Sequence, residues 1–356
     1  MCRPALLLAA LLVTPAFAEP IVIAHRGASG SRPEHTIAAY RLAIEQGADF
    51  IEPDLVMTKD DVLLIRHENE ISGTTDVAER PEFADRRATR SIDGRLVTGW
   101  FTEDFTLAEL KTLRARERLP ELRPANDKWR DEPIATFEEA LALLHAAGRS
   151  VGIYPETKHP SYFASIGKPM ERALVAALAR AGFDKPSDPV FIQSFEVSNL
   201  RQLRGMTKLR LVQLLDAEEP PYDQLLAGTG MTITAMTSPD GLMTIASYAD
   251  AIGPSKLLIE PRDAGGRALP PTKLIAQAHA AGLLVHAWTF RSENQFLAAG
   301  DRIGSDPAGH GDAGAEYRRF LGYGVDGLFS DFPGDAAAAA SFIGDEAFTL
   351  SSRDAT

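Results

Sequence analysis

Cysteine is the rarest residue of this sequence, with Cys2 as its single occurrence among 356 residues. One cysteine cannot form an intrachain disulfide, so a disulfide framework is excluded. Basic runs are missing as well, and the net charge of -12 argues against nucleic acid as a partner. After the first 18 residues no run approaches the roughly 20 apolar residues that span a bilayer. We therefore expect no stable membrane insertion.

The first 18 residues have the pattern of a secretory signal peptide. Arg3 provides a positive start, Leu6–Val13 an apolar segment, and Ala16–Ala18 a small-residue cleavage site. The alternative, a membrane anchor, requires a longer apolar run. Cleavage after Ala18 would remove Arg3 and Cys2, which changes the net charge from -12 to -13 and leaves no thiol nucleophile. We expect a secreted, periplasmic protein whose remaining residues 19–356 form one domain.

Short apolar runs alternate with amphipathic stretches along the rest of the chain. The predicted strands are Ile21–His25, Phe50–Leu55, Val62–Arg66, Val151–Pro155, Val190–Gln193, Leu209–Leu215, Leu257–Glu260, Leu283–Trp288 and Gly327–Ser330. The predicted helices are Thr36–Gln46, Thr136–Ala147, Met170–Ala181, Glu196–Leu203 and Thr272–Ala281. This alternation indicates βαβ units and a parallel sheet. When the second and third strands count as one hairpin-like unit, eight units result, which favours an α/β (β/α)₈ barrel over a doubly wound sheet.

Two segments break this rhythm. Residues 71–133, after the second strand unit, are rich in charge and show little strand pattern, so we expect an inserted subdomain with a short helix within Thr106–Leu119. We expect the apolar face around Trp100 and Phe101 to help shape the mouth of the barrel. Residues 300–314 are rich in Gly and Asp but lack EF-hand spacing, which predicts a loop without an assigned role.

Three carboxylates follow apolar runs at predicted strand ends. Glu52 and Asp54 are two residues apart, so strand alternation places both on one face, and Glu156 ends another run. Two such charges at about 4 Å repel by about 4 kcal/mol at an effective dielectric near 20. Separate salt bridges for each carboxylate are the alternative. At the mouth of a barrel, however, three converging carboxylates predict a divalent cation, with Ca²⁺ favoured over Mg²⁺ because it tolerates irregular oxygen ligation.

Cationic and imidazole side chains occupy the same positions. His25 and His67 end two predicted strands, Arg26 follows the first, and Lys158 lies two residues after Glu156. A single histidine at a strand end is usually structural. Two of them can act as acid and base, and the two cations can bind a phosphate. The combination predicts a phosphate-ester site.

Several motifs in order resemble one family. "HRGASGSRPEHT", "EPDLVMTKD" and "RHENEISGTTDV" are similar to segments of the glycerophosphodiester phosphodiesterases, especially their longer secreted bacterial branch. "PETKHP", "FIQSFE", "HAWTFR" and "GLFSDFP" resemble the family's later strand ends, and "TGWFTEDFTLAEL" resembles its insertion. The resemblance covers nearly all of the chain after residue 18.

The resemblance implies a barrel hydrolase that uses a divalent metal to cut glycerophosphodiesters into sn-glycerol 3-phosphate and an alcohol. It also implies roles for ten residues. These are metal binding by Glu52, Asp54 and Glu156; acid/base catalysis by His25 and His67; phosphate contacts by Arg26 and Lys158; and substrate contacts by Gln193, Phe195 and Trp288.

Two alternatives follow from the same features. A related barrel phospholipase of the D or C type would act on lipid phosphodiesters, but the sequence shows no aromatic or basic membrane patch. An exported solute-binding protein would also carry a signal peptide and an α/β pattern, but it needs two lobes and no acid/base pair. The sequence does not define an oligomeric state.

Overall fold

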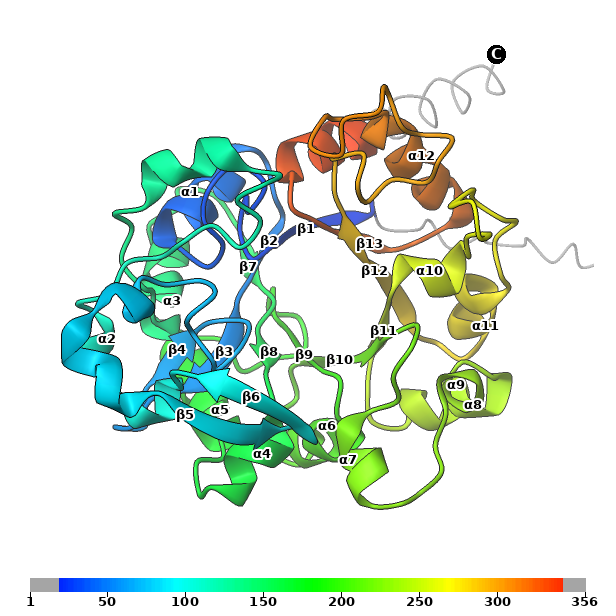
Figure 1. The fold of residues 1–356 in the computed structure, drawn as a ribbon. Coiled ribbons are helices and arrows are strands. Elements are labelled where there is room, and N and C mark those ends of the chain that lie inside the picture. Colours follow the sequence, from blue (N-terminus) through cyan, green and yellow to red (C-terminus); the bar gives the residue numbers. More distant parts are fainter. Residues whose placement is uncertain (1–18, 342–356) are drawn as a thin grey trace, which may run out of the picture.

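The computed structural model describes residues 19–341, so the predicted signal peptide lies outside the described residues. Eight parallel strand positions close into a barrel surrounded by helices (Figure 1). The strands are β1 (Ile21–His25), β2 (Phe50–Glu52), β3 (Asp54–Met57), β4 (Leu63–Ile65), β5 (Ala88–Ile92), β6 (Arg95–Gly99), β7 (Gly152–Ile153), β8 (Glu156–Thr157), β9 (Phe191–Ser194), β10 (Arg210–Leu215), β11 (Ala251–Pro254), β12 (Leu284–Phe290) and β13 (Gly327–Ser330). The predicted (β/α)₈ barrel is confirmed.

Two barrel positions consist of interrupted strands. β2 and β3 are separated only by Pro53, which has no N–H for the sheet, and β7 and β8 are likewise two halves of one position. β2 pairs with β7 and β3 with β8, while β1 pairs with both β2 and β13, so the ring of pairings has no free edge. β4 adds outside the ring as the antiparallel partner of β3, as the hairpin-like second unit predicts.

Helices cover the outside of the barrel (Figure 1). They are α1 (Ile37–Glu45), α2 (Leu107–Leu110), α3 (Phe137–His145), α4 (Pro160–Ser165), α5 (Glu171–Arg180), α6 (Val197–Arg204), α7 (Tyr222–Leu226), α8 (Ile233–Met236), α9 (Pro239–Ala246), α10 (Lys256–Ile259), α11 (Leu274–Ala280) and α12 (Ala313–Tyr323), with 3₁₀ turns at Val77–Glu79, Pro81–Arg86, Thr102–Asp104 and Pro124–Trp129. The five predicted helices are all present. Among the described residues, no helix is long and apolar enough to cross a membrane.

One predicted strand is wrong. Leu257–Glu260 falls on the short helix α10, which begins after Ser255, whose side chain accepts a hydrogen bond from the N–H of Leu257. The barrel strand is instead β11, Ala251–Pro254, whose small residues give a weak strand signal. Gly253 suits this place because an added Cβ would lie 2.6 Å from a methyl group of Leu214.

The segment 71–133 contains regular structure that the sequence pattern did not predict. β5 and β6 form an antiparallel hairpin whose turn is Asp93-Gly94, with φ of 47° and 79° at the two residues. The expected helix within Thr106–Leu119 is only α2, which starts with a capping box. The expectation for Trp100 and Phe101 is wrong, because Phe101 is fully buried in the core and the Trp100 indole donates to the carbonyl of Phe83.

The barrel interior explains why polar residues end its strands. Seven apolar side chains from different barrel positions form one layer inside the barrel, namely Ile23, Phe50, Tyr154, Phe191, Val212, Ala251 and Phe329. Because alternate side chains of a strand share a face, the residue two positions later points inward one layer higher. Those next residues include His25, Glu52, Glu156, Gln193 and Asp331. A closed apolar layer thus supports a polar layer at the carboxyl ends of the strands.

Candidate functional site

A cavity of about 330 Å³ lies above this apolar layer. Its wall includes eight of the ten residues singled out from the sequence, namely His25, Arg26, Glu52, His67, Glu156, Gln193, Phe195 and Trp288. Asp54 adjoins it through the carboxylate cluster described next, and Lys158 lines a neighbouring cavity. The barrel therefore brings all ten residues to one end of its strands.

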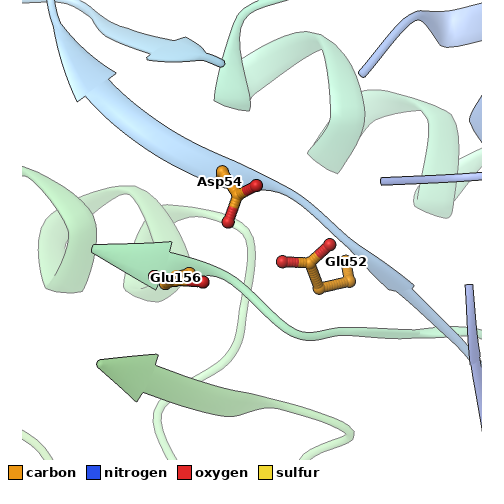
Figure 2. Close-up of side chains that lie close together, drawn as sticks. All are labelled: Glu52, Asp54 and Glu156. Atoms are coloured by element: carbon orange, nitrogen blue, oxygen red, sulfur yellow. The ribbon is translucent and has the colours of Figure 1, made fainter. Parts of the chain in front are cut away.

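The three carboxylates point toward one another between the β2–β3 strand and β8 (Figure 2). One oxygen from each of Glu52, Asp54 and Glu156 lies within 4.8 Å of the others, and all three residues are buried. Sheet register causes this approach, because Asp54 pairs directly with Glu156. Two hydrogen bonds fix the orientation of the Glu52 carboxylate, which accepts from the Gln193 amide at 3.0 Å and from the Arg26 backbone N–H at 2.8 Å.

The electrostatics of this cluster fit a cation. Burial and the neighbouring carboxylates raise the pKa of Glu52 well above its usual range, and burial with Asp54 raises the pKa of Glu156 to about 8. Burial alone would raise the pKa of Asp54 too, but His67 and Lys158 hold it well below its usual range. Asp54 Oδ1 is buried and has no hydrogen-bond partner. Three carboxylates that offer only oxygen ligands, one of them with the unpartnered atom Asp54 Oδ1, suit a hard divalent ion such as Ca²⁺ or Mg²⁺.

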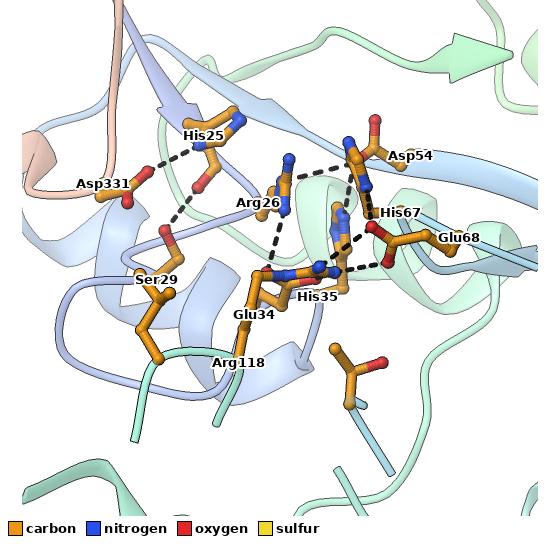
Figure 3. Close-up of polar contacts among 12 residues, drawn as sticks. His25, Arg26, Ser29, Glu34, His35, Asp54, His67, Glu68, Arg118 and Asp331 are labelled. Carbon is orange, nitrogen blue, oxygen red and sulfur yellow. Dashed lines mark hydrogen bonds and ion pairs between the residues drawn. The ribbon is translucent and has the colours of Figure 1, made fainter. Parts of the chain in front are cut away.

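His25 is oriented by a carboxylate from the far end of the chain (Figure 3). Its Nδ1 lies 2.6 Å from Asp331 Oδ1, and the other ring nitrogen points away from Asp331. Asp331 in turn accepts from Arg123 at 2.6 Å and from Arg291 at 2.8 Å. Burial and the charge of Arg26 lower the pKa of His25 to about 4, so the ring is neutral at pH 7 and can accept a proton.

His67 has a matching arrangement. Its Nδ1 lies 2.6 Å from Glu68, whose carboxylate is bound by both terminal nitrogens of Arg118 (Figure 3). Its Nε2 lies 3.2 Å from Lys158 Nζ, which also donates to Glu156 at 2.8 Å. Burial, with the charges of Arg26 and Lys158, lowers the pKa of His67 to about 3. Both histidines are therefore neutral rings with one nitrogen fixed by a carboxylate.

Arg26 stands at the turn that follows β1. Its backbone has φ of 58°, and its guanidinium lies 3.1 Å from Glu34 and 3.5 Å from Asp54. Asp54 also contacts the buried His35 at 2.8 Å. These contacts hold the guanidinium against the carboxylate cluster and beside the cavity that it lines.

Arg123 ties the segment 71–133 to the barrel beside His25, through the Asp331 carboxylate that both residues contact. The side chain is only 6% exposed and contacts Glu293 and Asp331, each at 2.6 Å. Breaking a buried ion pair from one side typically costs about 3–5 kcal/mol. We expect Arg123→Met to lower the free energy of unfolding by about 3 kcal/mol in urea denaturation. The matched control Arg130→Met, at a pair that is half exposed, should lose less than about 1 kcal/mol; equal losses would contradict this assignment.

Sequence reasoning missed the residues that orient the predicted ones. Asp331 could have been predicted from the sequence, because it directly follows a buried apolar strand, β13. His35 lies within the first quoted motif but not at a strand end. Arg118 and Arg123 lie in the charge-rich segment, where nothing local distinguishes them from solvated arginines. Only the closed barrel brings them to the site.

Comparisons with known proteins identify the family of this chain. The model of the glycerophosphoryl diester phosphodiesterase family matches residues 25–335. A glycerophosphodiester phosphodiesterase of Arabidopsis thaliana is 41% identical over 329 residues, which cover 88% of this chain and 84% of that protein. A glycerophosphodiester phosphodiesterase of Haemophilus influenzae is 30% identical over 88% of both chains.

Solved structures share the fold. A structure described as a putative glycerophosphoryl diester phosphodiesterase from Silicibacter pomeroyi has a TM-score of 0.64 at 23% identity and covers 91% of this chain and 94% of its own. An Oleispira antarctica phosphodiesterase, solved in complex with the product sn-glycerol-3-phosphate, has a TM-score of 0.58 at 21% identity, with coverages of 90% and 97%. The family match leaves no support for the solute-binding alternative. This chain belongs to the glycerophosphoryl diester phosphodiesterase family and is a glycerophosphodiester-cleaving enzyme.

Proposed function

We propose that this enzyme hydrolyses glycerophosphodiesters to sn-glycerol 3-phosphate and an alcohol, with a divalent metal and two histidines. The observation that carries the proposal is the convergence of three buried carboxylates and two carboxylate-oriented histidines at the mouth of one barrel. Glu52, Asp54 and Glu156 would hold the metal, with Ca²⁺ favoured over Mg²⁺. When bound, this ion supplies positive charge that binds substrate oxygens and stabilises negative charge on the phosphate.

The two histidines would divide the proton transfers. Because both rings are neutral in the free enzyme, the ring that acts as the acid must first bind a proton, which the negative charge of the bound phosphate favours. The glycerol 2-hydroxyl then attacks phosphorus, the neutral histidine takes the hydroxyl proton, and the protonated histidine gives its proton to the departing alcohol. The resulting cyclic phosphate is then opened by water with the histidine roles reversed. Asp331 and Glu68 position the two rings through their Nδ1 atoms and stabilise each ring while it carries the second proton.

Other predicted residues would bind the substrate. Arg26 and Lys158 provide fixed positive charge for the phosphate oxygens. Gln193 holds Glu52 and keeps its Oε1 without a partner, so it can accept from a substrate hydroxyl. Phe195 and Trp288 pack edge to face with ring centroids 5.9 Å apart and provide an apolar wall.

The test of this proposal is product identification. The purified enzyme is incubated with glycerophosphocholine and glycerophosphoglycerol, and the products are separated by chromatography. We expect sn-glycerol 3-phosphate with free choline or glycerol; the Oleispira complex with that product supports this expectation. Release of phosphocholine and glycerol would show cleavage of the other ester bond and contradict the proposed orientation.

The attack by the glycerol 2-hydroxyl makes a further prediction. A diester in which this hydroxyl is replaced by hydrogen keeps the phosphate and the alcohol but lacks the nucleophile. We expect no detectable cleavage of this 2-deoxy analogue, although it should still inhibit competitively. Efficient hydrolysis would instead indicate that a directly activated water attacks phosphorus.

The cellular setting and the lipid alternative belong to this proposal as well. The pattern of residues 1–18 supports export, and with it a place in the secreted, periplasmic bacterial branch of the family. Detection of the cleaved chain, beginning at Glu19, in the periplasmic fraction would test this.

The phospholipase alternative predicts that lysophosphatidylcholine is turned over at a rate comparable to glycerophosphocholine. We expect instead that the enzyme strongly prefers the soluble diester glycerophosphocholine.

A further inference from the structure

We infer that a second cavity beside the catalytic one binds the departing alcohol and selects alcohols that carry a positive charge, such as choline or ethanolamine. The inference rests on the proposed function, because it assigns a binding place to one half of the proposed substrate. This cavity also measures about 330 Å³. It lies between the β5–β6 hairpin and the segment that follows β10.

The two cavities meet at the reacting position. Both are lined by Glu156 and Phe195, and the second is also lined by Lys158. Two of the three clustered carboxylates, Glu52 and Glu156, line the first cavity together with His25, so the glycerol half of the substrate would occupy that side. With the phosphate near Lys158, the ester-linked alcohol extends into the second cavity.

The charge of the second cavity is strongly negative. Three of its carboxylates, Glu70, Glu196 and Asp216, form no ion pair with any residue of the described range 19–341, and Glu70 and Asp216 accept hydrogen bonds only from backbone N–H groups. Asp93 is paired only with the imidazole of His159, and its Oδ1 has no partner. Burial, with the charges of Asp223 and Asp93, raises the pKa of Glu196 to about 7, as expected where negative charge is uncompensated.

Apolar groups complete the wall. The cavity is lined by Ile92 and Val97 of the hairpin and by Pro221, Tyr222 and Leu225 of the segment after β10. The hairpin and α7 lie close together here, since a Cβ added at Gly94 would be 3.4 Å from the Tyr222 ring. Methyl and methylene groups of an alkylammonium alcohol suit such a wall, and an aromatic ring near a desolvated cation adds attraction. The two cations of this cavity, Arg95 and Lys158, are both paired with carboxylates. The remaining negative charge therefore favours a cationic alcohol over a neutral one of the same shape.

The first measurement compares two substrates that differ only in charge. Glycerophosphocholine and its 3,3-dimethylbutyl analogue, in which carbon replaces the ammonium nitrogen, have nearly the same shape. We expect wild-type kcat/KM to be higher for the choline ester by about tenfold, and the preference to shrink as salt is added. Glycerophosphoethanolamine should share the preference.

The second measurement removes the charge of the cavity. The double variant Glu70→Gln/Asp216→Asn keeps an oxygen for each backbone N–H that these side chains bind, so the local fold is retained. We expect it to reduce the ratio of kcat/KM for the choline ester over the neutral analogue by about tenfold. The control Glu218→Gln removes a charge from an exposed neighbour that does not line the cavity and should leave the ratio unchanged.

The outcomes separate this inference from the function on which it rests. If the wild type releases sn-glycerol 3-phosphate from both esters at equal efficiency, or the double variant keeps the full preference, the cation subsite is wrong and the hydrolase function stands. If neither ester yields sn-glycerol 3-phosphate, the proposed function fails and the inference falls with it.

Discussion

Replacing His25 or His67 by alanine is expected to lower the turnover of glycerophosphocholine by at least about 10², because a positioned acid or base contributes on the order of 10²–10⁴ in rate. Each ring is a neutral imidazole with one nitrogen fixed by a carboxylate, so its removal eliminates a proton-transfer group rather than a packing contact. Steady-state release of sn-glycerol 3-phosphate measures the effect.

A control separates this loss from unfolding. His145→Ala removes a solvent-exposed helical histidine that stacks on Phe183, and its turnover should remain within about twofold of wild type. Circular dichroism and thermal unfolding should be alike for all three variants. A folded His25→Ala or His67→Ala enzyme with nearly wild-type turnover would remove that histidine from the acid/base pair.

The second large effect concerns the carboxylate cluster. Glu52→Gln keeps one carbonyl oxygen, which can accept from either Gln193 or the Arg26 N–H but not from both, and it removes a ligand charge, so we expect the affinity for Ca²⁺ to fall by at least about 10². In EDTA the variant should remain folded, because the relief of repulsion among three buried carboxylates offsets the one hydrogen bond that is lost. Isothermal titration calorimetry with Ca²⁺ and Mg²⁺ measures the affinity.

The matched control replaces a buried carboxylate outside the cluster. Glu171→Gln on α5 retains an acceptor for Asn199 and should bind Ca²⁺ as wild type does. In wild type and in this control, Ca²⁺ at 100 times Kd should raise the free energy of unfolding by about 2.7 kcal/mol. If Glu52→Gln shows the same calcium affinity and the same stabilisation as these two, the ligand assignment is wrong.

The sequence predicted the parts of this enzyme that local pattern determines. Strand alternation placed Glu52 and Asp54 on one face, and the end of an apolar run singled out Glu156, whereas Gln193 was named only through the family resemblance. In the structure Glu52, Glu156 and Gln193 each follow an apolar interior residue by two positions. The same rule applies to Asp331, which lies two residues after Phe329, and it would have identified the partner of His25. The Asp93-Gly94 dipeptide is a strong hairpin signal that would have predicted β5 and β6.

The remaining features depend on contacts between distant parts of the chain. Arg123 reaches Glu293 and Asp331 across 170 and 208 residues, and no local periodicity encodes such a pairing. The prediction put the strand at Leu257–Glu260, because β-propensity favours that leucine-rich run over the small residues of β11. In the folded barrel, close packing against Leu214 requires a small residue, Gly253, in the true strand. Tertiary packing outweighed local preference in both cases.

Metal reconstitution tests the central claim most directly. The enzyme is stripped with EDTA, freed of chelator, and assayed for release of sn-glycerol 3-phosphate from glycerophosphocholine as Ca²⁺ or Mg²⁺ is titrated back. We expect the stripped enzyme to be folded and inactive, and turnover to return in proportion to occupancy of a single site per chain, with Ca²⁺ more effective than Mg²⁺. Full activity of the folded, metal-free enzyme would contradict the assignment of Glu52, Asp54 and Glu156 as a catalytic metal site.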